Sequence, residues 1–240
     1  MDYLELVKEL ASELRAAEPD DIESVNDLKA LEPRARNLAR WVQRSWVEIQ
    51  LRSDEYRFRK REDTIEINAD QAEYDLRLEL VEFQELAPFT SPVGQRYLLL
   101  GPPPPDQVFL GAPPPERRDH RIYFMPWNQY KGNKQARAQK GRPRIYTVTP
   151  DDRLILYPEP NEAYTLKVEY VRIPQTLKEN CDVPIMPERF HQLIVYHAVA
   201  DHGGTEEASM QFQRGLFKYN RLLRQLDTDQ IEPCTVMGTV

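Results

Sequence analysis

The stretch Tyr164-Thr165-Leu166-Lys167-Val168-Glu169-Tyr170 alternates apolar and polar side chains. A period of two predicts a strand that buries one of its faces. Similar short runs precede it, at residues 64–67, 74–83, 97–100, 108–110, 122–124, 144–149 and 154–157. Turn signals such as Pro150-Asp151-Asp152 separate most of them. This arrangement predicts an inserted antiparallel β-sandwich or barrel-like domain in the middle of the chain.

The two ends of the chain have the spacing of helices. Apolar residues recur every three or four positions in residues 3–14, 33–53, 190–200 and 205–226, which predicts four helices with one apolar face each. Gly203-Gly204 predicts the end of the third helix and a tight connection to the fourth. We therefore expect an α+β fold in which the N- and C-terminal helices form a bundle.

The domain organisation that follows has four parts. Residues 1–58 are expected to hold the N-terminal helices of the bundle, and residues 59–183 the β-rich insertion with proline-rich loops. Residues 184–226 are expected to form the helical hairpin that completes the bundle, and residues 227–240 an extended tail.

The middle of the chain is rich in proline. Ten of the 20 prolines lie between Pro88 and Pro126, so this part is not expected to be helical. Residues 102–105 and 113–115 are uninterrupted proline runs. They are either polyproline ligands for a WW or SH3 groove or two stiff loops, and we favour the loops. Residues 126–139 predict a short helix between strands.

The charge balance restricts the classes of partner. The 240 residues include 32 Lys and Arg against 39 Asp and Glu, a net charge of −7, which argues against nucleic-acid binding over the whole surface. No run approaches the roughly 18 apolar residues that span a bilayer, and the first residues do not resemble a signal peptide, so we expect a soluble protein without a membrane partner. Cys181 and Cys234 form no CxxC motif and fit folding in a reducing cytoplasm.

No catalytic motif stands out. The chain has no glycine-rich phosphate loop and no GxSxG motif. His191, His197 and His202 are six and five residues apart, whereas a helical metal-binding pair needs three or four. His197 and Asp201 are one turn apart, close enough to share a hydrogen bond. We predict no catalytic residues, no metal and no cofactor, and paired carboxylates leave a cell-wall hydrolase as a weaker alternative.

One stretch is strongly basic. Between residues 131 and 144 there are six cations without an intervening acid: Lys131, Lys134, Arg137, Lys140, Arg142 and Arg144. This run either contacts DNA phosphates or an acidic partner surface, or is a solvated loop.

The last 14 residues have no helical pattern but remain apolar. Exposing such a segment to water is unfavourable, so we expect it to dock on a partner. The candidate contact residues are Ile231, Pro233, Val236, Met237 and Val240.

Several motifs follow one another in a set order. They are Trp46-Val47-Glu48-Ile49-Gln50, Tyr56-Arg57-Phe58, Ile122-Tyr123-Phe124-Met125-Pro126-Trp127-Asn128-Gln129-Tyr130, Gly141-Arg142-Pro143-Arg144-Ile145-Tyr146, Leu154-Ile155-Leu156-Tyr157-Pro158-Glu159-Pro160 and Asp182-Val183-Pro184-Ile185-Met186-Pro187-Glu188-Arg189-Phe190-His191. This series resembles the head–tail adaptor proteins of tailed bacteriophages, the connector subunits beneath the portal. The resemblance covers residues 38–226.

The resemblance implies a structural virion protein rather than an enzyme. It implies a ring, expected to be a dodecamer, that binds the portal protein, extends the DNA channel and offers a platform to tail or nozzle proteins. Double-stranded DNA would pass through without sequence-specific binding, and the apolar tail would reach the portal. Assembly would take place in the host cytoplasm. Because acidic subunits repel each other, we expect the free protein to be largely monomeric and to form its ring on the portal. A tail-completion or nozzle subunit is the alternative structural role.

Overall fold

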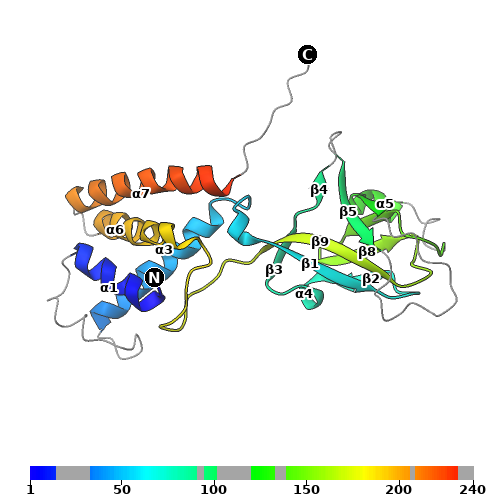
Figure 1. Ribbon diagram of the computed structural model, residues 1–240, viewed down its shortest axis with the longest axis horizontal. Helices are drawn as coiled ribbons and strands as arrows, with labels where there is room; N and C mark the ends of the chain where they lie inside the picture. The colour runs from blue at the N-terminus through cyan, green and yellow to red at the C-terminus, as the bar shows by residue number, and fades with distance from the viewer. Residues whose placement is uncertain (15–32, 91–94, 102–119, 133–138, 206–208, 232–240) are drawn as a thin grey trace, which may run out of the picture. The chain divides into compact units, whose positions relative to one another are not determined.

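The computed structural model describes residues 1–14, 33–90, 95–101, 120–132, 139–205 and 209–231. The chain divides into two compact units (Figure 1). Met1–Arg59 and Pro174–Val240 form the first, which we call the helical unit, and Lys60–Ile173 form the second, the β unit. The fold is therefore α+β, and the β unit is an insertion between two parts of the helical unit.

The described residues of the helical unit form four long helices, with α6 at the centre. The elements are α1 (Tyr3–Leu14), α3 (Pro33–Leu51), α6 (Gln192–Thr205) and α7 (Ser209–Gln230), with the short 3-10 helices η2 (Arg57–Arg59) and η5 (Glu188–Phe190). Helix α6 packs against α7, α3 and α1 (Figure 1). A helix covered on several sides needs apolar residues all round, as in Leu193, Ile194 and Val195, which are all buried.

Glycines in α6 and α7 permit a close approach of the two helices. The predicted end of the third helix at Gly203-Gly204 is correct to within one residue, because α6 ends at Thr205. A Cβ atom on Gly203 would lie 2.5 Å from the backbone nitrogen of Phe212, and one on Gly215 would lie 2.7 Å from that of Ala200. The two helix backbones therefore approach too closely for any side chain at these positions.

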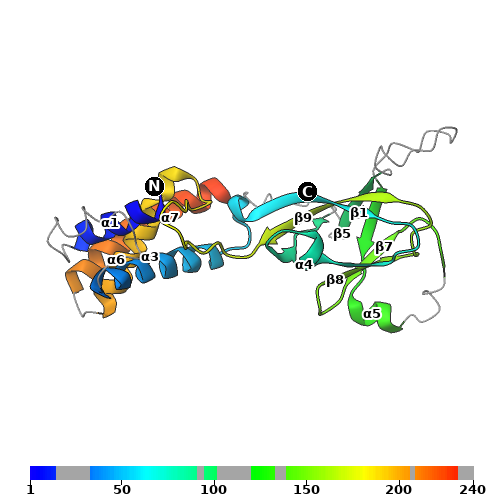
Figure 2. The same cartoon turned by 90° about the horizontal axis from the view of Figure 1, so that it is seen from below.

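The described residues of the β unit form a nine-stranded sheet that curls into a half-barrel (Figure 2). Its strands are β1 (Lys60–Ile67), β2 (Glu73–Asp75), β3 (Phe83–Leu86), β4 (Phe89–Thr90), β5 (Arg96–Gly101), β6 (His120–Phe124), β7 (Ile145–Val148), β8 (Arg153–Tyr157) and β9 (Tyr164–Arg172). The main order is β1-β9-β5-β6-β7-β8-β2. The described strands form a single sheet, so the predicted sandwich is not confirmed, and the β6–β7 pair is parallel.

Strand β9 has the alternation that its sequence predicts. It pairs antiparallel with β1, β3 and β5. Tyr164, Leu166, Val168 and Tyr170 are buried in a core confined to the β unit. The sheet is thus organised around this strand.

The segment predicted as one strand over residues 74–83 is instead divided into three elements. Strand β2 ends at Asp75, the short helix α4 (Leu76–Glu79) follows, and β3 begins at Phe83. The Asp75 carboxylate accepts a hydrogen bond from the Arg77 backbone N–H at 3.0 Å, which caps α4. Leu78 is 84% exposed, so the alternation of leucines here does not mark a buried face.

The segments around the proline-rich middle of the chain are only partly described. A short helix, α5 (Trp127–Gly132), lies within residues 126–139. The strand expected at residues 108–110 and both proline runs lie outside the described residues. No helix of the described chain is long and apolar enough to cross a membrane.

Candidate functional site

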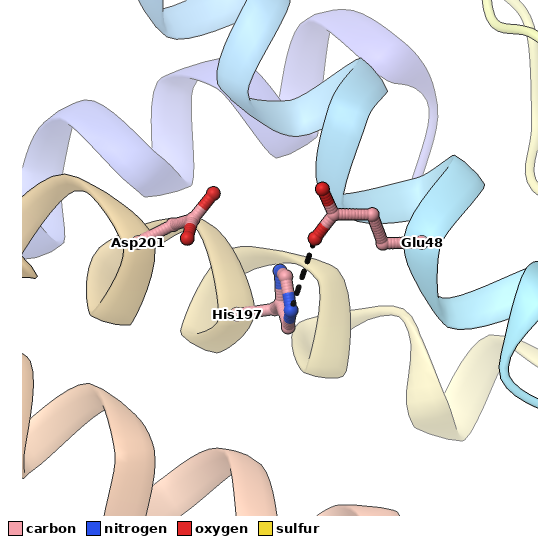
Figure 3. A group of neighbouring side chains, drawn as sticks. All are labelled: Glu48, His197 and Asp201. Carbon is pink, nitrogen blue, oxygen red and sulfur yellow. Dashed lines mark ion pairs between the residues drawn. The ribbon is translucent and has the colours of Figure 1, made fainter.

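A polar cluster lies between two helices of the helical unit. Glu48 comes from α3, and His197 and Asp201 come from one face of α6 (Figure 3). His197 Nε2 lies 3.6 Å from Glu48 Oε2. One ligand atom from each residue lies within 4.8 Å of the others. By residue type, an imidazole and two carboxylates fit a divalent cation such as zinc.

His197 is held from several directions. Its Nδ1 lies 3.0 Å from Ser45 Oγ, and its ring meets the Tyr219 ring edge-on at 4.8 Å between centroids. Burial lowers the pKa of His197, while the charges of Glu48 and Asp201 oppose that shift. The imidazole is therefore held mainly neutral in the interior of the unit.

A guanidinium already balances the two carboxylates. Arg44 Nε lies 2.8 Å from Glu48 Oε1 and 3.9 Å from Asp201 Oδ2. The hydrogen bond that Arg44 donates to Glu48 is the main reason that the pKa of Arg44 is raised. A cation at this cluster would have to compete with Arg44, so the contacts favour a charge-balanced link between α3 and α6 over a metal centre.

The sequence contained part of the signal for this cluster. The i, i+4 spacing of His197 and Asp201 suggested a hydrogen bond between them, but the nitrogens of His197 face Ser45 and Glu48. Glu48 is far away in the sequence, so only the packing of α3 on α6 could reveal it.

The basic stretch does not present six equivalent cations. Lys134 and Arg137 lie outside the described residues. Lys140 Nζ is 2.6 Å from Asp70 Oδ1, and Arg142 lies over the Tyr164 ring, 5.9 Å from its centroid. Lys131 and Arg144 are exposed. The four described cations therefore have different surroundings, and Lys140 is already paired with a carboxylate.

Of the apolar tail residues, one is described. Ile231 is partly buried and packs against the core of the helical unit. Pro233, Val236, Met237 and Val240 lie outside the described residues. Any contact that the tail makes with a partner is therefore expected to begin after Ile231.

A small cavity lies in the β unit. It has a volume of about 150 Å³, and its apolar lining includes Phe83, Leu86, Phe124 and Val148. Tyr146 also lines it, and its hydroxyl group is buried without a hydrogen-bond partner. Burial raises the pKa of this tyrosine. A cavity of this size holds roughly one benzene ring.

Helix α7 exposes an apolar surface that the sequence did not predict. Phe212 and Leu216 were expected on the buried face of the fourth helix but are partly exposed, and Met210 and Phe217 are more exposed still. Leu223 and Leu226, which were expected on the same face, are buried as predicted. The seven-residue spacing of Met210 and Phe217 was the available signal.

One protein family matches nearly the whole chain. The model of a family described as SU10 adaptor protein matches residues 1–236. No curated protein matches the chain.

Proposed function

The chain belongs to the SU10 adaptor protein family, and from this membership we propose that it forms a ring beneath the portal of a phage head. The family is one of phage structural adaptors, which places the protein in the virion with portal and tail components as partners. Beyond family membership, we propose that the ring is a dodecamer and that it extends the DNA channel. The match over residues 1–236 is the observation that carries the proposal.

The electrostatics support a channel through which DNA moves. DNA that must slide should meet few strong phosphate contacts, because each neutralised phosphate adds to the affinity. The net charge of −7 and the pairing of Lys140 with Asp70 both reduce such contacts. Lys131 and Arg144 remain exposed for weak contacts with the backbone of the last DNA segment.

The apolar tail is the proposed anchor on the portal. Pro233, Val236, Met237 and Val240 combine three apolar side chains with a proline, which suits an extended segment between neighbouring portal subunits. Ile231 packs on its own helical unit, so we exclude it from the anchor.

Reconstitution with the portal tests the proposal. Purified protein is mixed with isolated portal rings, and the complexes are examined by negative-stain electron microscopy. We expect an additional ring on one end of the portal, with twelve-fold symmetry in class averages. Binding to purified tails but not to portals would favour the tail-side alternative and contradict this proposal.

A further inference from the structure

The N-terminal half of α7 presents an apolar stripe. Met210 is 84% exposed and Phe217 is 72% exposed. Phe217 is two residues from Gly215, which faces α6, so it lies about 200° around the helix from that contact. Exposed apolar side chains clustered on one face, with an aromatic among them, are typical of protein–protein contacts.

On the same face of α7, the C-terminal half of the helix is basic. Arg221 and Arg224 are one and two turns beyond Phe217, and both are exposed. Neither side chain forms an ion pair with a residue that the structure describes. Arg214, by contrast, is 3.1 Å from Glu13. The stripe formed by Met210, Phe217, Arg221 and Arg224 therefore joins apolar anchors to cations that have no partner in their own described chain.

A groove elsewhere on the helical unit has the complementary character. Val183, Pro184 and Met186 supply its apolar surface, and Asp2, Glu5 and Glu188 contribute three carboxylates. Its volume is about 510 Å³, which is within the range of ordinary binding clefts. The amino group of Met1 lies 3.4 Å from Glu188 Oε1, so the carboxylates outnumber the ammonium group by three to one.

We propose that the α7 stripe of one copy docks in the groove of a second copy, with Phe217 on Val183 and Arg221 beside Glu188. This inference rests on the proposed function and names the contact between neighbouring subunits of the ring. Two α7 stripes placed against each other across a two-fold axis would bring like charges together, whereas the groove offers the opposite charge. Because the stripe and the groove are different surfaces, the contact is heterologous, and a heterologous contact generates a ring when the rotation between copies closes.

Disulfide trapping between two singly substituted chains tests the contact. Full-length Phe217→Cys and Val183→Cys proteins are made with Cys181→Ser and Cys234→Ser, mixed, and oxidised with diamide. We expect a disulfide-linked heterodimer from the mixture, because oxidation accumulates even a weakly populated contact. A chain with both cysteines should form a ladder of oligomers. Leu78→Cys replaces an apolar residue of the β unit that is more exposed than Phe217 or Val183, and it serves as the control for random collision.

The outcomes separate the alternatives. Cross-linking of Phe217→Cys mainly to itself would show an α7–α7 contact and overturn the groove assignment. A yield no higher than that of the Leu78→Cys control would also overturn it. Trapping without decoration of portals would support the contact and contradict the proposed function. Decorated portals without trapping would support the proposed function and contradict the contact.

A charge exchange adds an independent readout. Arg221→Glu and Glu188→Lys should each lower the initial rate of heterodimer trapping, by about three- to tenfold, because each places like charges at the contact. The mixture that carries both changes, one on each chain, should recover most of the rate. Equal rates in all four mixtures would contradict the pairing of these two residues.

Discussion

His197 Nδ1 lies 3.0 Å from Ser45 Oγ, and this contact joins α6 to α3 in the interior of the helical unit. Ser45 is fully buried, and on the other side of the ring Nε2 faces Glu48. Burial of an imidazole with polar partners on both nitrogens fixes its orientation and favours the neutral form. The link is therefore sensitive to protonation.

Stability should fall on mild acidification. Burial lowers the pKa of both His197 and His191 below the ordinary value of 6.5, so the unfolded chain binds protons that the folded chain does not. Stability from these groups is present above pH 6.5 and is lost as the pH falls from there towards the folded pKa values. We expect the melting temperature to decrease between pH 7 and pH 5, measured by calorimetry. His197→Asn should flatten this dependence, and an unchanged slope would contradict the assignment.

Alanine substitutions at two adjacent glycines should change the free energy of unfolding in opposite directions. The added methyl group of Gly203→Ala would lie 2.5 Å from a backbone nitrogen of α7, which should cost about 1–3 kcal/mol of unfolding free energy. Gly204→Ala meets only the Phe212 ring at 3.5 Å, an ordinary contact, and should stabilise the helix by up to about 1 kcal/mol. Urea denaturation of both variants measures the difference, and equal effects would argue against the close approach of α6 and α7.

A pair of tyrosines tests the hydrogen-bond assignments in the β unit. The Tyr170 hydroxyl donates to the Val81 carbonyl oxygen at 3.0 Å, whereas the buried Tyr146 hydroxyl has no partner. Tyr170→Phe should lower the unfolding free energy by about 1 kcal/mol, and Tyr146→Phe should leave it unchanged or raise it. Chemical denaturation of the two variants gives both values. A loss of stability in Tyr146→Phe as large as in Tyr170→Phe would show that its hydroxyl is satisfied.

The parts of the fold that could be predicted are those in which local pattern and burial agree. The alternation from Tyr164 to Tyr170 predicted β9 because every second residue enters the core. The leucines at 76, 78 and 80 have the same alternation, but the cap formed by Asp75 starts a helical turn there and leaves Leu78 exposed. Alternation of apolar residues with a period of two therefore identifies a strand only where no side chain forms a competing hydrogen bond with the backbone.

The candidate sites depended on contacts between distant segments. Glu48 meets His197 only because α3 packs on α6, and a spacing of 149 residues contains no local signal for it. The close approach of Gly203 to Phe212 of α7 could not be predicted for the same reason. The seven-residue spacing of Met210 and Phe217 was visible, but whether that face is covered depends on the tertiary structure.

Truncation should separate the proposed portal anchor from the fold. The core of the helical unit that the structure describes is built from residues before 232, and Ile231 packs against it. Deleting residues 232–240 should therefore leave the melting temperature nearly unchanged and abolish attachment to portal rings, seen as undecorated portals in negative-stain images. Ile231→Ala is the matched control, because it removes a partly buried side chain and should lower the melting temperature while portal attachment persists. If the truncated protein decorates portals at the occupancy of the full chain, the tail is not the anchor and the exposed Lys131 and Arg144 become the next candidates.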